Sequence, residues 1–226
     1  MAKPLAKIQA RPDYVDEVYQ TLLDAISDGT LAPGTRITQE EIAEQMAVSR
    51  SPVLQALRLL KKDGLVQDAP GRGLLVTPLD PTWIGDLYAV RGALDALAAR
   101  LAAERGHAID PAILEAGRRA STARKVKAMI DADMAFHQAI YRAAGNPLIA
   151  QSAEIHWAHL RRAMGAVLQH SSQRKAICDE HEAIAEAIAA GDGARAAALS
   201  EQHTTRAGEN LMRELGEILQ ANPQPG

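Results

Sequence analysis

The sequence predicts a mainly α-helical protein of two units, and three observations support this prediction. Apolar residues recur at helical spacing over most of the 226-residue chain. Alanine is abundant and only 3% of the residues are aromatic, a composition that suits packed helices better than sheets. Strand-like segments at 65–66 and 74–76 flank a glycine-rich tip. The predicted fold combines an N-terminal helical unit that bears a small β-hairpin with a C-terminal all-α antiparallel bundle.

Proline, glycine and charge place the boundaries of these units. The N-terminal stretch has no continuous apolar run of the secretory type, and no run elsewhere reaches the length of a membrane span. One cysteine, Cys178, rules out an intrachain disulfide and suits a reducing cytoplasm, where we expect the protein to act. The expected organisation is a flexible arm (1–12), a first domain (13–77), a stiff linker (78–82), a helical domain (83–220) and a disordered tail (221–226).

The first domain is expected to begin with an amphipathic helix over Tyr14–Ser27. A second helix follows Thr38, and Ala47-Val48 then supply a short turn into a third helix, for which Ser49 is the expected N-cap. Pro52 falls in the first turn of this third helix, where its missing N–H costs nothing. The inward face is apolar at helical spacing, with Val53, Ala56, Leu57 and Leu60.

The outward face of the third helix suits a helix that lies in the major groove of DNA, because it offers hydrogen-bonding groups for base edges and cations for phosphates. The candidate DNA-binding residues on this helix are Ser49, Arg50, Ser51, Gln55 and Arg58. The hairpin that follows carries Arg72 at its tip, and Gly71 and Gly73 let the backbone approach a partner closely. An ordinary cationic surface would explain any one of these elements. Their full order predicts a winged helix-turn-helix.

The charge of the chain limits the kind of nucleic-acid binding that is expected. A formal net charge of −3 argues against a protein that coats nucleic acid indiscriminately. It does not argue against a specific binder, which needs only a local basic face. One recognition helix reads too few base pairs to find a site in a genome, so we expect a homodimer on an inverted repeat of double-stranded DNA.

Beyond residue 82 the pattern is helical only, with glycine, asparagine and proline between the helices. The expected helices are 83–104, one that follows Asp110-Pro111 and becomes indistinct at 121–127, then 129–144, 148–170, 173–190 and 194–219. The last two flank Gly191-Asp192-Gly193, which predicts a tight turn between antiparallel helices.

Four residues of this bundle form a candidate metal site. Asp133 and His137 are i, i+4 and share one helix face. His181 lies ten residues before Gly191 and His203 ten residues after Gly193, so both stand about 15 Å from the turn by helical rise. One carboxylate and three imidazoles suit a divalent transition metal and leave positions open for water or an anion.

Three readings of this set remain open from the residues alone. The metal site can belong to a binding protein, or to a metal-dependent hydrolase that uses the four residues around an activated water. Against the hydrolase, no general base is clearly placed beside the cluster. In the third reading the histidines are incidental, and the helical domain only dimerises. Metal analysis and operator binding separate the three.

Short motifs make the first domain resemble the DNA-binding half of GntR-type transcriptional regulators. The motifs are PGT at 33–35, EIAEQM at 41–46, VSRSPV at 48–53, DGLV at 63–66 and PGRG at 70–73. The resemblance implies that Arg50 reads bases and that the wing tip with Arg72 enters the neighbouring minor groove. Leu54 stands where the family usually carries an arginine, so the operator sequence of relatives does not carry over.

The helical domain resembles the FCD effector domain of the FadR branch of this family. The resemblance rests on LYAVRGALDALAARLAA at 87–103, DMAFHQAIYRAAGN at 133–146 and EHEAIAEAIAAGDGARAAALSEQH at 180–203. It implies a metal bound by Asp133, His137, His181 and His203, with zinc expected and nickel or manganese as alternatives. It also implies an arginine that faces the ligand, here Arg91, for which a salt bridge to Asp95 is the competing role. Asn146 is expected first to end a helix and second to contact the ligand.

Together these resemblances imply a metabolite-responsive transcriptional regulator rather than an enzyme. Repression that the effector relieves is the family's commoner mode, and activation is the alternative. A divalent ion held by one carboxylate and three neutral imidazoles leaves one positive charge inside an apolar bundle, and Arg91 would add another. We therefore expect a small organic acid as the effector.

Overall fold

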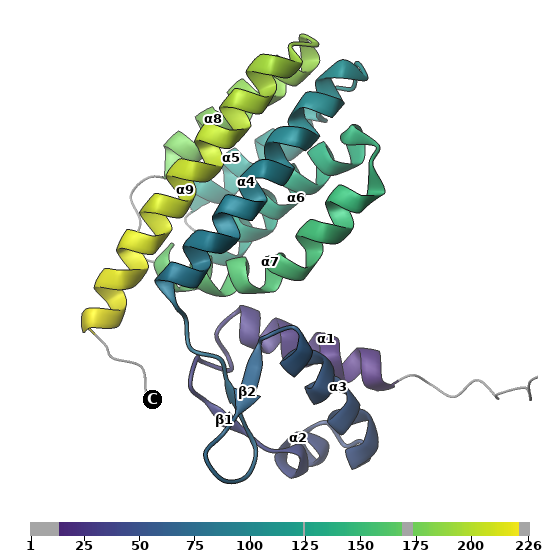
Figure 1. Cartoon of the computed structure of the whole chain (residues 1–226), viewed down its shortest axis with the longest axis vertical. Coiled ribbons are helices and arrows are strands. Elements are labelled where there is room, and N and C mark those ends of the chain that lie inside the picture. Colours follow the sequence, from purple (N-terminus) through teal and green to yellow (C-terminus); the bar gives the residue numbers. More distant parts are fainter. Residues whose placement is uncertain (1–13, 124, 169–173, 222–226) are drawn as a thin grey trace, which may run out of the picture.

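The computed structural model describes residues 14–123, 125–168 and 174–221, and it has the two predicted units (Figure 1). The predicted arm at 1–12 and residues 222–226 of the predicted tail lie outside the described residues. No helix in the described ranges is both long enough and apolar enough to cross a membrane.

The N-terminal unit is the predicted winged helix-turn-helix with one additional strand. Its elements are α1 (Tyr14–Ser27), β1 (Arg36–Ile37), α2 (Gln39–Gln45), α3 (Arg50–Lys62), β2 (Val66–Asp68) and β3 (Leu74–Val76). The hairpin β2–β3 was predicted, whereas β1 was not. It pairs antiparallel with β3, which places β3 in the centre of a β1-β3-β2 sheet.

The burial of apolar residues determines which face of α3 points to solvent. The four residues predicted to face inward, Val53, Ala56, Leu57 and Leu60, are all buried. They belong to one core with Leu22 and Ile26 of α1 and Ile42 of α2. Thr38 and Glu41 form a capping box that starts α2, in which each side chain bonds the other residue's backbone N–H. With its inner face fixed in this way, α3 exposes the polar face that the sequence predicts.

The C-terminal unit is all-helical in its described residues, as predicted. It comprises α4 (Pro81–Glu104), α5 (Pro111–Ala123), α6 (Val126–Ala144), α7 (Pro147–Val167), α8 (Arg174–Ala189) and α9 (Gly193–Ala221). The long helices α4 and α9 run side by side (Figure 1), and α4 also packs on α6. The predicted linker ends earlier than expected, because α4 begins at Pro81 with the Asp80 side chain as its cap.

The turn between α8 and α9 brings two predicted metal ligands together. Gly191 has φ 72°, a conformation that favours glycine. Asp192 accepts a hydrogen bond from the backbone N–H of Arg195 at 3.0 Å and so caps α9. The two helices return antiparallel from this turn, and His181 and His203 meet between them.

Helix α7 joins the two units. On one side, His159 donates from Nε2 to the Asp63 carbonyl at the end of α3 (2.8 Å), and Arg162 donates to the Thr77 carbonyl. Arg162 is 5% exposed, and burial lowers its pKa to about 10. On the other side, Met164 and Val167 line a cavity inside the bundle. One helix therefore contacts both the C-terminal end of α3 and the interior of the C-terminal unit.

Candidate DNA-binding surface and metal centre

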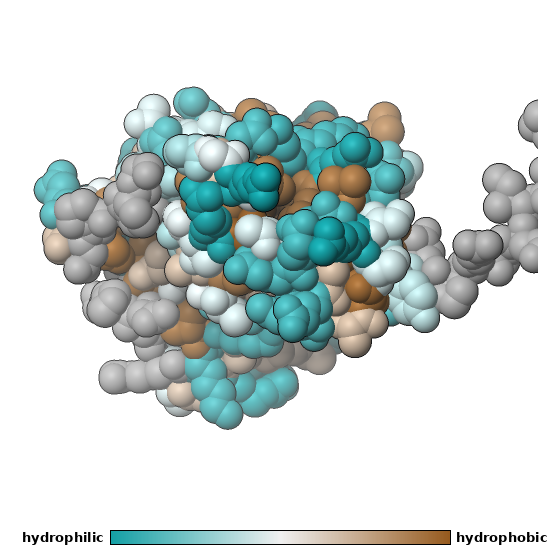
Figure 2. All heavy atoms as spheres, turned by 90° about the horizontal axis from the view of Figure 1, so that it is seen from below, coloured by the Kyte–Doolittle hydropathy of each residue, from teal (hydrophilic) through white to brown (hydrophobic). Residues whose placement is uncertain are grey.

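The residues predicted to contact DNA lie where α3 meets solvent. Ser49, Arg50, Ser51, Gln55 and Arg58 are all exposed. Ser49 occupies the N-cap position as predicted, but its side chain makes no capping hydrogen bond. Seen from the end formed by the N-terminal unit, the surface is largely hydrophilic with small hydrophobic areas between polar side chains (Figure 2).

Arg50 is held at its backbone, and its charged end makes an exposed ion pair. Gln39 donates a hydrogen bond to the Arg50 carbonyl at 2.7 Å, which ties α2 to the first residue of α3. The guanidinium lies 3.3 Å from Glu40, and both side chains are more than half exposed. Exposed pairs of this kind contribute about 0–1 kcal/mol, so a stronger acceptor can replace Glu40.

The wing tip is held by Arg36, which is not among the predicted DNA-binding residues. Arg36 on β1 donates to the carbonyls of Pro70 (2.7 Å) and Arg72 (2.5 Å). The Arg72 side chain itself is exposed and makes no ion pair within the described residues. Gly73 has an intramolecular reason to be glycine: at φ +89°, a Cβ would lie 2.7 Å from the Ile37 carbonyl. Close packing on β1 thus explains Gly73 without any partner.

The four predicted metal ligands converge in the C-terminal unit. One ligand atom from each of Asp133, His137, His181 and His203 lies within 4.8 Å of all the others. His181 Nε2 is 3.3 Å from His203 Nε2 and 3.4 Å from Asp133 Oδ1. Ligand atoms about 2.1 Å from a tetrahedral metal ion are about 3.4 Å apart. These separations therefore suit a transition-metal ion, and the cluster could hold one.

Two further carboxylates lie beside the histidines, and neither belongs to the predicted ligand set. Glu180 accepts a hydrogen bond from His203 Nδ1 at 2.8 Å, which leaves the lone pair of a neutral ring on Nε2. This bond and Arg206 lower the pKa of Glu180. Asp95, 2% exposed, has Oδ2 3.3 Å from His137 Nδ1. Although burial opposes its charged form, His137 and Arg91 hold the pKa of Asp95 below its ordinary value.

Buried polar atoms without partners supply a test of whether a metal fits. Within the described residues, Asp133 Oδ2 and both ring nitrogens of His137 are buried and make no hydrogen bond. Such atoms are costly to bury unless something binds them. Burial also lowers the pKa of His137 and His181, which favours the neutral imidazoles that bind metals. The donor set therefore fits a divalent ion on grounds that are independent of spacing in the sequence.

Arg91 plays the structural role that competed with ligand binding, and it also reaches the cluster. Its Nε lies 3.2 Å from Asp95 Oδ2 and its Nη2 lies 3.6 Å from Asp133 Oδ2. The guanidinium carbon lies 4.6 Å from the centre of the Trp157 ring. Because Asp95 already neutralises Arg91, this arginine brings no uncompensated charge to the site.

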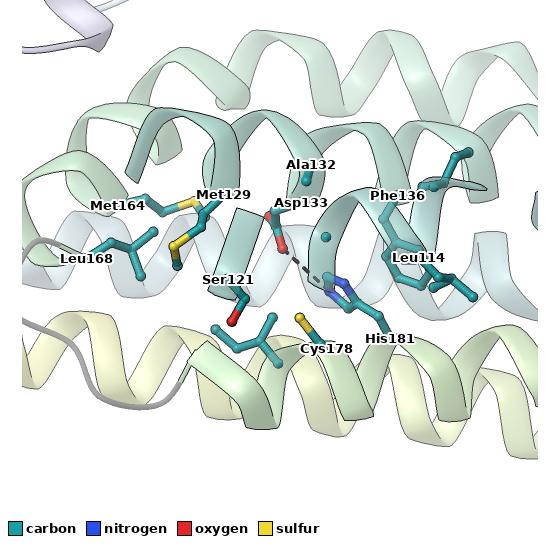
Figure 3. A pocket seen from close by; sticks show the side chains of 13 residues that line it. Leu114, Ser121, Met129, Ala132, Asp133, Phe136, Met164, Leu168, Cys178 and His181 are labelled. Atoms are coloured by element: carbon teal, nitrogen blue, oxygen red, sulfur yellow. Dashed lines mark ion pairs between the residues drawn. The ribbon is translucent and has the colours of Figure 1, made fainter. Parts of the chain in front are cut away.

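Two cavities adjoin the cluster and meet at Asp133. The larger has a volume of about 220 Å³. Its polar lining is Arg91, Asp133, Glu180, His203, Arg206, Asn210 and Glu214, and the remainder is Tyr88 and aliphatic side chains. The smaller, of about 50 Å³, is lined by Asp133 and His181 with mostly apolar neighbours. In Figure 3 Asp133 and His181 face each other, with Met129, Met164 and Leu168 on one side and Phe136 and Leu114 on the other. A ligand could therefore reach the cluster with one polar end and pack its remainder on apolar side chains.

Asn146 lies outside this site. It is the N-cap of α7, and its side chain accepts a hydrogen bond from the backbone N–H of Leu148 at 3.1 Å. It lines neither cavity beside the cluster. The expected helix-end role accounts for Asn146.

Comparisons with known proteins match both units. Residues 14–76 match the family of bacterial regulatory proteins called the gntR family, and residues 86–206 match the FCD domain. The chain is 31% identical over 187 residues to an uncharacterized HTH-type transcriptional regulator in an unstable DNA locus of Streptomyces ambofaciens. That alignment covers 78% of this chain and 75% of the relative.

Two solved structures share the fold. Escherichia coli McbR/YncC aligns with a TM-score of 0.75 at 20% identity, covering 88% of this chain and 97% of that chain. A GntR-type protein from Rhodococcus sp. RHA1 aligns with a TM-score of 0.73 at 23% identity, covering 88% and 98%. The arrangement of a small winged unit followed by a helical unit is therefore shared with known proteins.

Proposed function

The chain belongs to the gntR family of bacterial regulatory proteins and carries an FCD domain, and from this premise we propose that it is a metabolite-responsive transcriptional repressor. It acts as a homodimer on an inverted-repeat operator and releases DNA when a small carboxylate binds beside a metal ion. The family and its matched relatives are transcriptional regulators, which confirms a regulator over the alternative of a hydrolase.

In this proposal Arg50 contacts base edges directly. The other candidate residues on α3 lie beside it: Ser49, Ser51, Gln55 and Arg58. The free ends of these exposed side chains suit base edges and phosphates. Arg72, on a wing fixed by Arg36, supplies the contact in the adjacent minor groove. A homodimer presents this surface twice, which doubles the readout.

Zinc is the proposed ion, with nickel and manganese as alternatives, held by Asp133, His137, His181 and His203. A bound divalent ion supplies a positive centre that accepts an oxygen of an anionic ligand. The observation that carries this assignment is the set of buried polar atoms on Asp133 and His137 that make no hydrogen bond. Glu180 holds the imidazole of His203 by a hydrogen bond, and Asp95 lies 3.3 Å from Nδ1 of His137.

The charge balance of the buried cluster supports an anionic effector. Asp133 cancels half the charge of a divalent ion, and Asp95 cancels Arg91, so one positive charge remains once neutral imidazoles complete the site. A carboxylate oxygen on the metal neutralises it. Arg206 at the wall of the larger cavity is paired with Glu180 at 3.0 Å, so that pair leaves the balance unchanged. The guanidinium of Arg91 lines the same cavity and can donate to a second polar group of the same molecule.

Helix α7 is the proposed route from effector to DNA. Met164 and Val167 line the effector cavity, while His159 and Arg162 on the same helix hold the carbonyls of Asp63 and Thr77 in the N-terminal unit. A carboxylate that moves the cavity-facing side of α7 therefore changes the contacts that orient α3. The response is a shift between two arrangements of the N-terminal units in the dimer.

A panel of short mono-, di- and hydroxycarboxylates tests the effector proposal. With zinc-loaded protein, one class should raise the melting temperature by roughly 5–10 °C at about 100 times its dissociation constant, because a ligand of the folded state stabilises it by about 2.7 kcal/mol. The same acid should release DNA in a mobility-shift assay. Matched amines and the metal-free protein are the controls, and an equal shift in either would contradict the proposal.

Glu180→Gln tests the orientation of the metal ligands. Without the carboxylate on His203 Nδ1, zinc affinity should fall about 10- to 100-fold while the four ligands remain. Competition with a chromophoric chelator measures the dissociation constant. Glu186→Gln, an exposed change on the same helix α8, is the control. Unchanged zinc affinity in Glu180→Gln, or an equal loss in Glu186→Gln, would show that Glu180 does not position His203.

A further inference from the structure

Leu54 is an apolar side chain among the exposed polar residues on the outward face of α3. Leu54 on α3 is 37% exposed, whereas α3 buries four apolar residues on its inward face: Val53, Ala56, Leu57 and Leu60. It follows Arg50 by one helical turn and precedes Arg58 by one turn, so the three side chains lie along the same side of α3. An exposed leucine alone needs no explanation. Its position between two arginines that face DNA in the proposed function does call for one.

The surroundings of Leu54 form a concave surface. A cleft of about 480 Å³ lies between α3 and the wing, and Leu54 shares its wall with Thr38, Arg58, Lys61 and Arg72. Lys61 is paired with Asp68 at 2.7 Å, whereas Arg58 and Arg72 make no ion pair within the described residues. The cleft therefore offers the cations of Arg58 and Arg72 beside Leu54. Its acidic residues, Glu40 and Asp68, are already paired with other cations.

The chemistry of the major groove determines which group this leucine can recognise. Base edges there present hydrogen-bond donors, acceptors and one apolar group, the C5 methyl of thymine. A leucine makes no hydrogen bond to a base, so packing it on a polar base edge would leave that edge without its hydrogen bonds. Burial of the leucine is favourable only against an apolar group. In the proposed function Arg50 and Arg58 contact guanine or phosphate, and Leu54 between them would then face the base edges.

We infer that Leu54 is a specificity-determining residue that packs on the C5 methyl of a thymine in each half-site of the operator. This inference rests on the proposed DNA-binding function and deepens it. It assigns a thymine to the operator position beside the one read by Arg50. It also gives a positive role to the residue that stands where the family usually has an arginine.

The test begins with the full-length protein and a pool of random DNA, from which an operator is selected. Each thymine of the selected half-site is then replaced by deoxyuridine, which removes only the methyl group. At one position this change should weaken binding of the unmodified protein about fourfold per half-site, the expected loss for one buried methyl. In Leu54→Ala the same replacement should have no effect at that position.

Leu59→Ala is the matched control, because Leu59 is 39% exposed on the same helix but does not line the cleft. It should retain the full deoxyuridine effect. The inference is overturned if no deoxyuridine weakens binding, or if Leu54→Ala keeps the same discrimination as the unmodified protein. A pool that yields no enriched sequence would instead refute the proposed function, and the role of Leu54 with it.

Discussion

Replacing Arg50 with alanine is expected to abolish specific operator binding while the fold is retained. A bidentate contact from arginine to guanine is worth about 1–3 kcal/mol, and a dimer makes it twice, so affinity should fall by roughly 30-fold to 10⁴-fold. The melting temperature should not change, because the guanidinium is exposed and its pair with Glu40 is exposed too. Mobility shift at fixed salt on a selected operator measures the loss.

The control for Arg50→Ala must remove the same charge elsewhere. Arg195 is exposed near the α8–α9 turn, at the far end of the molecule from the N-terminal unit (Figure 1). Arg195→Ala should bind the operator like the unmodified protein. If Arg50→Ala lowers affinity equally for operator and random DNA, Arg50 contacts phosphate and not bases. Unchanged operator affinity would remove α3 from the interface altogether.

The parts of the fold that local pattern specifies could be predicted from the sequence. The bounds of α1 are those expected from its amphipathic spacing, and the inward face of α3 is buried residue by residue. The meeting of His181 and His203 was also predictable, because equal offsets from a glycine turn place two residues at the same height on antiparallel helices. Apolar periodicity and turn residues, both local features of the sequence, specify these helices and this turn.

Features that depend on contacts distant in sequence were not predictable. Strand β1 has only two residues, too few for a periodic signal, and exists because β3 offers it a partner. Asp95 and Glu180 look like ordinary helical acids until folding places them beside His137 and His203. The contact of Gly73 with Ile37, which gives that glycine an intramolecular purpose, likewise spans separate elements.

Arg91 has two expected roles, and the structure shows one of them. The sequence allowed either a ligand contact or a pair with Asp95, and the structure shows the pair, with Asp133 close by. Removing Arg91 would take away the cation that pairs with the buried Asp95, and breaking a buried ion pair in this way typically costs about 3–5 kcal/mol. Arg91→Ala would therefore report mainly on stability, and Arg91→Lys, which keeps the charge but loses the fork, is the better probe of effector binding.

Loss of one imidazole should remove the metal and its contribution to stability. Purified protein is expected to hold about one divalent ion per chain, and His203→Ala should hold almost none after dialysis. A ligand present at about 1,000 times its dissociation constant stabilises the folded state by about 4 kcal/mol, or roughly 10 °C in melting temperature for a chain of this size. Elemental analysis and thermal unfolding with and without added zinc measure both effects.

The comparison of metal-loaded and metal-free protein separates this effect from simple damage to the core. His203 is 3% exposed and bonded to Glu180, so its removal also destabilises the metal-free protein. Only the increment on adding zinc reports on the metal, and it should be large in the unmodified protein and absent in His203→Ala. His107→Ala, at an exposed position, should keep the full increment. If His203→Ala still binds one zinc ion with an unchanged increment, the cluster is not the metal site, and the buried nitrogens of His137 require another explanation.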